Sequence, residues 1–266
     1  IELFPFGMRV NYPDGAFEEL VLHSGDHALS IAVHSAAAAE LALLPRLNLR
    51  RDGTTFEVID DALVFYESDS AQHHEDTPPY LAIACDRACT AHGLDLDRHA
   101  AWGTLLGIAQ LNIKHIFYGT DPGTDLRCTL AFDFSAQAAA AKARQYVARD
   151  AIGHEKRKHY RRLTNSYLWT DDLEYNRALA WSLAASHTFV VEEFGKGIWA
   201  GLPWFKTNWG RDTFIALPGT SLVSGQFADA KAIIDNFATL QNDDSEDVDY
   251  GRIPNLVSSL DDIIYN

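Results

Sequence analysis

The sequence is poor in cysteine and in positive charge, and each shortage excludes a class of protein. Three cysteines among 266 residues are too few, and odd in number, for a fold held together by disulfides; we expect reduced thiols. Lysine and arginine number 22 against 37 aspartates and glutamates, which gives a formal net charge of −15. Binding to a phosphate backbone or an anionic membrane needs a basic surface. We therefore expect neither nucleic acid nor a membrane as a partner.

Long apolar runs, a leader and the common nucleotide motifs are also missing. No apolar run approaches the roughly 18 residues of a membrane span. The chain opens at Ile1 without a charged and then apolar segment, so we expect no signal peptide, a cytoplasmic location and a piece of a longer protein. The sequence has no phosphate loop, no dinucleotide fingerprint and no nucleophile elbow. We expect no cofactor.

The first half of the chain has the pattern of short strands. Apolar and polar residues alternate over 29–34 and 130–134, and residues 12–15 (Tyr-Pro-Asp-Gly) are a turn signal. The other strand-like runs lie at 17–22, 56–59, 62–66, 80–84 and 111–118. These runs predict an antiparallel β-sandwich over residues 1–134. We expect a loop over 67–79 and one helix within 86–110.

From residue 136 the pattern becomes helical. Residues 136–163 are rich in strong helix formers and predict a linker helix within 135–170, whose basic end at 154–162 forms a solvated face. Asp171 and Glu174 then have the spacing of a capping box. The broad apolar stripe that follows predicts a helix buried on more than one side, ended by Gly195 and Gly197.

Two further helices are predicted near the end of the chain. The first covers about 212–224, with Pro218 expected to kink or restart it, and the second runs from 227 to about 241. The buried face of the second is predicted to consist of Phe227, Ala230, Ile234, Phe237 and Ala238. Residues 195–211 are expected to form a loop. Successive helices with short connections favour a helical toroid or bundle.

The segment 195–211 concentrates aromatic residues beside charge. Four of the six tryptophans lie between 181 and 209, and the aromatic residues lead directly to Arg211 and Asp212. Flat aromatic faces stack on the C–H faces of sugars, while a guanidinium fork and a carboxylate bind hydroxyl groups. The neighbouring arginine favours ionised Asp212, which suits hydroxyl binding better than proton donation. The alternative is a buried Arg211–Asp212 ion pair with the tryptophans as core.

Several short motifs of this region recur in a fixed order. They are Gly201-Leu202-Pro203-Trp204-Phe205, Asn208-Trp209-Gly210-Arg211-Asp212-Thr213-Phe214-Ile215-Ala216-Leu217-Pro218-Gly219, Gly225-Gln226-Phe227, Ala230-Lys231, Ile253-Pro254-Asn255 and Tyr265-Asn266. Together they resemble the start of the catalytic domain of the amylo-α-1,6-glucosidase (glycogen debranching enzyme) family, part of a glucoamylase-like (α/α)6 group. The resemblance covers about 170–266, and 41–58 more loosely resembles the β-rich domain that precedes it in bacterial relatives.

The resemblance implies an α+β protein of two domains. Residues 1–134 would form the antiparallel β-sandwich, 135–170 the linker helix, and 171–266 the first helices of an incomplete (α/α)6 toroid. It also implies inverting hydrolysis of α-1,6-linked glucose from glycogen-like or oligosaccharide substrates, with an α-glucan as partner. The substrate-binding residues predicted on this basis are Trp204, Phe205, Trp209, Arg211, Asp212, Asn255, Tyr265 and Asn266.

The catalytic residues remain unassigned. Inversion needs two carboxyl groups roughly 6.5–9.5 Å apart, and the resemblance implies that both lie beyond residue 266. Glu192-Glu193 is explained by a helix end packed by Phe189 and Phe194. Two alternatives therefore stay open, an exo-α-glucosidase that acts on another small glucoside and a carbohydrate-binding module without the carboxyl pair.

Two groups of metal-ligand residue types are weaker candidates. The acidic run at 243–249 is either a solvated loop or a calcium loop, although it lacks the EF-hand spacing. Cys85, Cys89 and His92 lack a fourth ligand. We predict no metal site.

Overall fold

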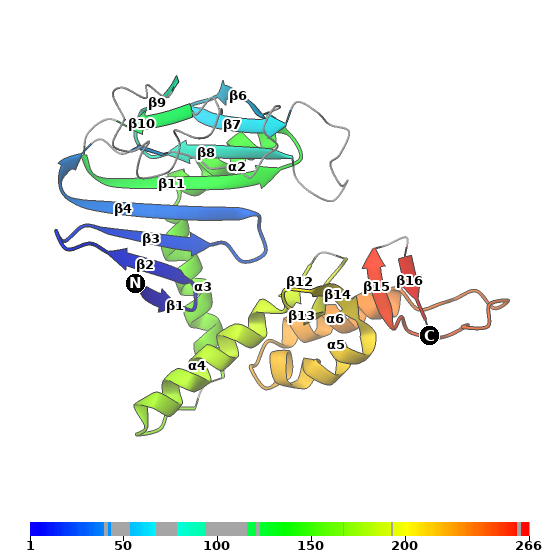
Figure 1. Cartoon of the computed structure of the whole chain (residues 1–266). Helices are drawn as coiled ribbons and strands as arrows, with labels where there is room; N and C mark the ends of the chain where they lie inside the picture. The colour runs from blue at the N-terminus through cyan, green and yellow to red at the C-terminus, as the bar shows by residue number, and fades with distance from the viewer. Residues whose placement is uncertain are drawn as a thin grey trace. The chain divides into compact units, whose positions relative to one another are not determined.

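The computed structural model describes residues 1–39, 42–43, 54–67, 79–93, 116–120, 123–166, 168–192, 194–259 and 262–265. The chain folds into two compact units, Ile1–Glu155 and Lys156–Asn266. The first unit is rich in strands and the second contains both helices and strands, so the chain is an α+β protein (Figure 1). The predicted domain limits at 134 and 170 stay predictions. Among the described helices, none combines the length and apolar character that a membrane crossing requires.

The first unit is built on an eight-stranded antiparallel sheet in the order β1-β2-β3-β4-β11-β8-β7-β6 (Figure 1). Its strands are β1 (Glu2–Phe4), β2 (Gly7–Asn11), β3 (Phe17–Leu22), β4 (Ala28–Ala39), β6 (Thr54–Ile59), β7 (Ala62–Glu67), β8 (Tyr80–Cys85) and β11 (Gly123–Asp133). A three-stranded sheet, β5-β10-β9, consists of β5 (Ala42–Leu43), β10 (Ile116–Thr120) and β9 (Cys89–Gly93).

The strand predictions of this half are confirmed where the structure describes them. The turn at 12–15 joins β2 to β3, with Gly15 at a φ of +87° and its amide donating to the Tyr12 carbonyl over 3.1 Å. The first part of 111–118, most of the loop at 67–79 and most of the helix expected within 86–110 fall outside the described residues. Residues 89–93 of that last range are a strand rather than helix.

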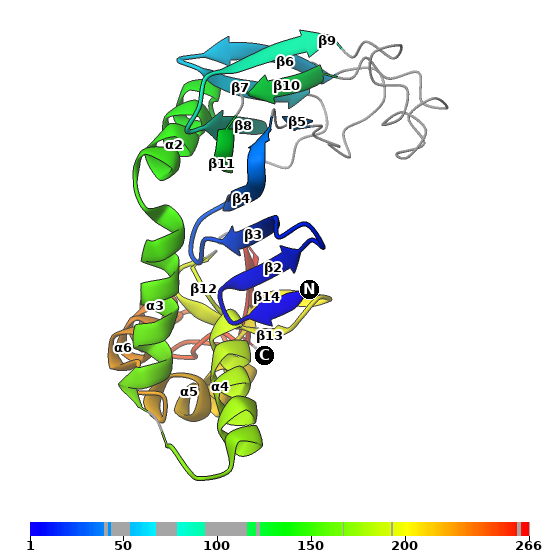
Figure 2. The same cartoon turned by 90° about the vertical axis from the view of Figure 1, so that its left-hand side faces the viewer.

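Small side chains let a helix pack closely on the large sheet. Helix α2 (Ala136–Ala148) begins at Ser135, whose hydroxyl accepts from the Ala138 amide over 3.1 Å. Its buried alanines contact β7, β8 and β11, and Figure 2 shows the helix running along that sheet. The buried members of this core are Ala28, Ala62, Val64, Ala82, Ala84, Ala131, Ala136, Ala139, Ala140 and Ala143.

The single linker helix predicted at 135–170 is wrong in detail. The backbone turns extended at Arg149, and a separate helix, α3 (Ala151–Asn165), follows. A buried polar group fixes the start of α3: Glu155 is 2% exposed and accepts from the Ser24 amide over 3.1 Å. Its other oxygen lies 3.8 Å from Nδ1 of His23. A buried carboxylate needs such partners, and these contacts attach the first turns of α3 to residues 23–24.

Among the described residues, the second unit combines most of α3, three further helices, a π-helical turn and a five-stranded antiparallel sheet in the order β12-β13-β14-β15-β16. The helical elements are α4 (Leu173–Thr188), α5 (Gly210–Leu217), η3 (Pro218–Leu222) and α6 (Phe227–Thr239). The strands are β12 (Val190–Val191), β13 (Gly197–Gly201), β14 (Phe205–Trp209), β15 (Leu256–Ser259) and β16 (Asp262–Ile264). Its core consists of Ile198, Leu217, Ala230, Ile233, Phe237 and Val257.

The loop predicted at 195–211 is wrong, because most of it forms the hairpin β13–β14. Trp199 pairs with Asn208, and Gly201 pairs with Phe205. Aromatic residues favour strands, and β14 also pairs with β15 on its other edge through Asn208 and Trp209. A search for single periodic patterns misses this hairpin since glycines interrupt the alternation.

Three details of α4 differ from the predictions. The helix ends at Thr188, well before Gly195 and Gly197, because strand β12 follows it. The α4 cap is Asp172 rather than Asp171; its carboxylate accepts from the amides of Glu174 and Tyr175. Only Asn176 of α4 is buried, so the expected burial on several sides is absent within the described residues. Its apolar side chains include exposed ones such as Trp181.

The buried face of α6 is rotated from the predicted one. Ala230, Ile233 and Phe237 are buried as a 3-4 repeat, whereas Phe227 is 66% and Ile234 47% exposed. Pro218 does restart the helix, since α5 ends before it and the π-helical turn begins there. Gly225, with a φ of +71°, ends this segment as predicted.

Candidate functional site

The candidate site is built around the start of α5. Trp209 occupies the N-cap position with extended backbone (φ −95°, ψ 120°), so Arg211 and Asp212 fall in the first helical turn. Arg211 is exposed and Asp212 is half-buried. A carboxylate in the first turn is stabilised by the helix dipole and by unpaired backbone amides. The helix start therefore offers negative charge and a guanidinium fork to the same neighbourhood.

A close backbone contact determines what lies beside this helix start. A Cβ atom on Gly210 would lie 2.1 Å from the Pro254 carbonyl oxygen, so only glycine fits there. The Gly210 amide donates to the Asn255 carbonyl oxygen over 2.8 Å, and the Asn255 amide donates to Ile264 over 2.7 Å. Asn255 itself is half-buried. Residues 45 positions apart in sequence, Gly210 and Asn255, are thereby joined directly.

The predicted aromatic residues fall into two groups. Trp209 is half-buried, and its indole Nε1 donates to the Thr207 hydroxyl over 2.9 Å. Trp204 and Phe205 lie at the other end of β14, where they are 82% and 60% exposed. At about 3.4 Å per strand residue, Phe205 and Trp209 are roughly 14 Å apart along the strand. The structure thus separates an exposed aromatic hairpin tip, Trp204 and Phe205, from the helix start.

Of the last two predicted residues, Tyr265 forms a structural hydrogen bond and Asn266 is not described. The Tyr265 hydroxyl donates to the Leu240 carbonyl oxygen over 2.9 Å, which ties the end of β16 to the end of α6. That hydroxyl therefore has a structural partner already. Asn266 lies outside the described residues. The structure brings together Trp209, Arg211, Asp212 and Asn255, with the hairpin tip farther along β14.

The alternative of a buried Arg211–Asp212 ion pair is wrong. Arg211 is exposed, and within the described ranges these two side chains form no ion pair. Glu192, in contrast, does have an ion-pair partner, Lys196, at 2.8 Å. Lys196 also contacts Asp229 over 2.7 Å, and these two carboxylates raise its pKa above the usual value although burial opposes them. Glu192 therefore forms an ion pair, but the helix end expected at this point is wrong, because α4 ends at Thr188 and Glu192 follows β12. Glu193 lies outside the described residues.

Sequence reasoning missed a buried polar side chain next to the site and a buried indole nitrogen on the neighbouring strand. Asn208 is 1% exposed, and its side-chain oxygen and nitrogen have no hydrogen-bond partner among the described residues. Trp199 is the cross-strand neighbour of Asn208, and its indole nitrogen is also buried without a hydrogen-bond partner in the described part of the chain. Gly197 makes room for Asn208, since a Cβ there would lie 2.3 Å from its Nδ2. The signal available was a polar residue directly before Trp209 in the Thr207-Asn208-Trp209 run.

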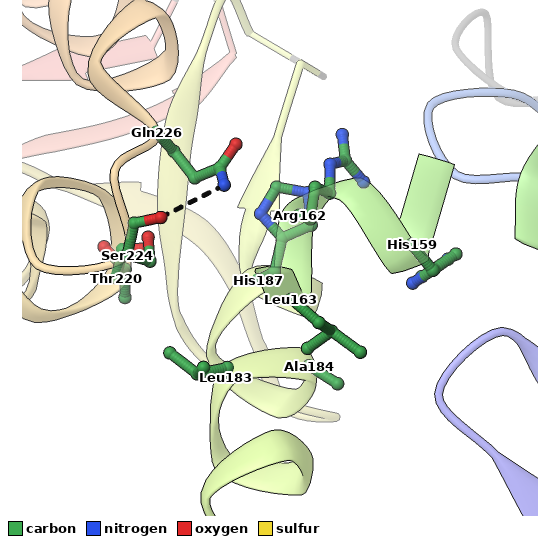
Figure 3. A pocket seen from close by; sticks show the side chains of 9 residues that line it. All are labelled: His159, Arg162, Leu163, Leu183, Ala184, His187, Thr220, Ser224 and Gln226. Atoms are coloured by element: carbon green, nitrogen blue, oxygen red, sulfur yellow. Dashed lines mark hydrogen bonds between the residues drawn. The ribbon is translucent and has the colours of Figure 1, made fainter. Parts of the chain in front are cut away.

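A separate pocket lies within the second unit, away from the predicted sugar-binding residues. Figure 3 shows its lining: His159, Arg162, Leu163, Leu183, Ala184, His187, Thr220, Ser224 and Gln226. Burial and the neighbouring Arg162, His159 and Lys158 lower the pKa of His187 to about 4, with Asp229 opposing. His187 is therefore neutral at pH 7. None of the predicted substrate-binding residues lines this pocket.

The weaker metal candidates gain no support. In the segment 242–249, carboxylate and amide oxygens accept from nearby backbone amides, as in Asp244 to Glu246 and Asp247 to Asp249. Among the described residues, no group of three or more metal-ligating side chains comes together. Cys85 on β8 is paired with Cys128 on the neighbouring strand β11. The side chains of Cys89 and His92 lie outside the described part.

Comparisons with known proteins find sequence similarity in the C-terminal part of the chain. Residues 164–266 match the family Amylo-alpha-1,6-glucosidase. The glycogen debranching enzyme of Saccharomyces cerevisiae is 34% identical over 110 residues, which are 40% of this chain and 7% of that enzyme. This chain therefore spans less than a tenth of the yeast enzyme.

One solved structure has a similar fold. The crystal structure of a bacterial glucoamylase complexed with acarbose is similar with a TM-score of 0.53 at 10% identity. The similarity covers 96% of this chain and 42% of the glucoamylase chain, and it concerns the fold. The helix start and the hairpin tip both lie within residues 164–266, the part of the chain that matches the amylo-alpha-1,6-glucosidase family.

Proposed function

We propose that the chain is part of a glycosidase of the glycogen-debranching type, and that the start of α5 binds a glucose unit of an α-glucan. The observation that carries the proposal is the grouping of Trp209, Arg211, Asp212 and Asn255 at one helix start within the family segment. The bacterial glucoamylase of similar fold was solved with acarbose, which supports an α-glucan as the ligand.

Each side chain has a distinct role in this proposal. The carboxylate of Asp212 accepts hydrogen bonds from two adjacent hydroxyl groups of the sugar, and the helix dipole stabilises its charge. Arg211 donates to sugar oxygens through its exposed guanidinium. The half-buried Trp209 offers one ring face, and its indole nitrogen is held by Thr207. Because the hairpin tip lies roughly 14 Å along β14, we place Trp204 and Phe205 against neighbouring sugar units.

The proposed reaction is hydrolysis of an α-1,6-linked glucose with inversion. It requires one carboxyl group as acid and another as base that holds a water, roughly 6.5–9.5 Å apart. Asp212 binds hydroxyls in this scheme and serves neither purpose. We place the acid and base on further helices of an (α/α)6 toroid, of which α4, α5 and α6 would be the first. Fully or partly exposed apolar residues on these helices, such as Trp181 and Ile215, support further packing partners.

Calorimetric titration with acarbose tests the binding site directly. Asp212→Asn keeps the size of the side chain and removes its charge. Loss of charged hydrogen bonds worth about 1.5–3 kcal/mol predicts roughly 10- to 100-fold weaker binding. Trp204→Ala should weaken binding of a longer maltooligosaccharide more than binding of glucose. Asp171→Asn, at an exposed position before α4, is the matched control and should bind as the parent chain does.

Two outcomes decide between the proposal and its alternatives. Unchanged acarbose affinity in Asp212→Asn would contradict the assignment of the helix start. Glucose release is then measured on a phosphorylase-limit dextrin and on isomaltose, with a protein that includes the rest of the toroid. Release from isomaltose alone favours an exo-α-glucosidase. Sugar binding without release from either substrate favours a carbohydrate-binding module.

A further inference from the structure

Two cysteines of the first unit face each other across the centre of the large sheet. Cys85 is the last residue of β8, and it is the direct partner of Cys128 in the antiparallel pairing of β8 with β11. Their Sγ atoms are 2.8 Å apart, although 43 positions separate them in sequence. The structure holds both residues as thiols. Closing an S–S bond of about 2.05 Å would require a movement of only about 0.8 Å.

The strand pairing favours a bond at this position. The Asp86 amide donates to the Arg127 carbonyl oxygen over 2.9 Å, so that neighbouring pair is of the hydrogen-bonded kind. The two kinds of pair alternate along an antiparallel ladder, which makes Cys85 and Cys128 a non-hydrogen-bonded pair. Such pairs have Cα atoms about 4.5 Å apart. That separation lies within the range of about 4.4–6.8 Å found for disulfides.

The surroundings hold the two thiols in this register. On one side, Arg127 and Asp86 form an ion pair over 3.0 Å, and the Arg127 amide donates to the same carboxylate over 2.9 Å. On the other side, Cys85 packs against the buried cluster Leu63, Phe65, Leu81 and Ile83. Cys128 is 1% exposed, whereas Cys85 is half-buried. Cys85 is therefore the thiol that a dissolved oxidant reaches first.

We propose that Cys85 and Cys128 are a site of reversible oxidation that closes to an intramolecular disulfide with oxidised glutathione. The Cys85 thiolate attacks one sulfur of the glutathione disulfide, breaks its S–S bond and releases one glutathione thiolate. The Cys128 thiolate then attacks Sγ of Cys85 and releases the second glutathione. The protein dithiol loses two protons and two electrons, and one glutathione disulfide becomes two glutathione thiols.

The disulfide would fix the point where the chain leaves the large sheet. After Cys85 the chain passes through a short bend into β9, which belongs to the three-stranded sheet. A bond to β11 prevents the end of β8 from separating from β11. It also closes a loop in the unfolded chain and so lowers the entropy of the unfolded state. Oxidation should therefore stabilise the first unit. The Cys85-x3-Cys89 spacing of the sequence points to a different partner, and only the strand pairing identifies Cys128.

The test is oxidation of the folded chain in glutathione buffers of increasing oxidised fraction. We expect two of the three thiols to disappear together, with loss of two hydrogen atoms in the intact mass. Non-reducing peptide mapping should show a Cys85–Cys128 cross-link, and dithiothreitol should reverse it. A rise of about 5 °C or more in the melting temperature of the first unit should accompany the cross-link.

Cysteine variants separate this pair from the third cysteine. Cys89→Ser should keep the cross-link and its effect on the melting temperature, whereas Cys85→Ser and Cys128→Ser should abolish both. Peptide mapping of the unaltered chain keeps the test valid if a variant fails to fold. A cross-link that includes Cys89, glutathione adducts without a cross-link, or three thiols that survive oxidation would each overturn the proposal.

Discussion

Replacement of Gly210 by alanine tests the contact that holds the candidate site together. The new Cβ would lie 2.1 Å from the carbonyl oxygen of Pro254 and 3.3 Å from its carbon. Both neighbours are backbone atoms, so the start of α5 must move away by about 1 Å to relieve the overlap. Overpacking of this kind costs about 1–3 kcal/mol. Weakening the 2.8 Å bond from the Gly210 amide to Asn255 adds about 1 kcal/mol.

The helix propensity of alanine offsets part of this cost. Alanine is favoured over glycine by up to about 1 kcal/mol in a helix, so the net destabilisation of Gly210→Ala should be about 2 kcal/mol. For a urea slope of about 1–3 kcal/mol per M, the unfolding midpoint should fall by about 1 M. Gly219→Ala is the matched control, because a Cβ there meets nothing within 4 Å. It should leave the midpoint unchanged or raise it slightly.

Tryptophan fluorescence is a suitable probe for this comparison. Five of the six tryptophans lie in residues 156–266, so the signal reports mainly on the second unit. The same displacement moves Arg211 and Asp212, and Gly210→Ala should therefore also weaken acarbose binding, whereas Gly219→Ala should not. Equal midpoints for the two variants would refute the close approach of α5 to residues 254–255, and with it the geometry of the site.

Two further predictions concern the second unit. Ile233→Ala should lower its unfolding free energy by about 2–5 kcal/mol because Ile233 is fully buried, and Ile234→Ala, at a 47% exposed position, by under about 1 kcal/mol. Equal losses of unfolding free energy for the two variants in urea denaturation would contradict the burial of the Ile233 face of α6. The pKa of His187 is about 4 in the folded chain against 6.5 for the free side chain, so the unfolded state binds more protons between these values. Stability should therefore fall as the pH drops from about 6.5 to 4, by about 1–2 kcal/mol after allowance for solvent screening. His187→Gln should flatten that decline in thermal melts, and an unchanged slope would contradict the burial of a neutral imidazole.

Local patterns in the sequence determined most of the secondary structure. Alternation located strands at 29–34 and 130–133, and the Tyr-Pro-Asp-Gly turn and Pro218 marked boundaries correctly. These features depend on neighbours within a few residues, where side-chain preference and backbone geometry are decisive. The ordered motifs from Gly201 onward pointed to the family that residues 164–266 match, since such motifs are a property of the chain rather than of its packing.

Only the tertiary structure decided which residues meet. Pairing across strands made Cys128 the partner of Cys85, and a glycine-sized gap brought Asn255 to the start of α5. Packing also rotated the buried face of α6 to Ile233 and turned an expected loop into the β13–β14 hairpin. Each of these depends on contacts between distant segments, whose register and burial are set by the whole core and leave no mark in local periodicity.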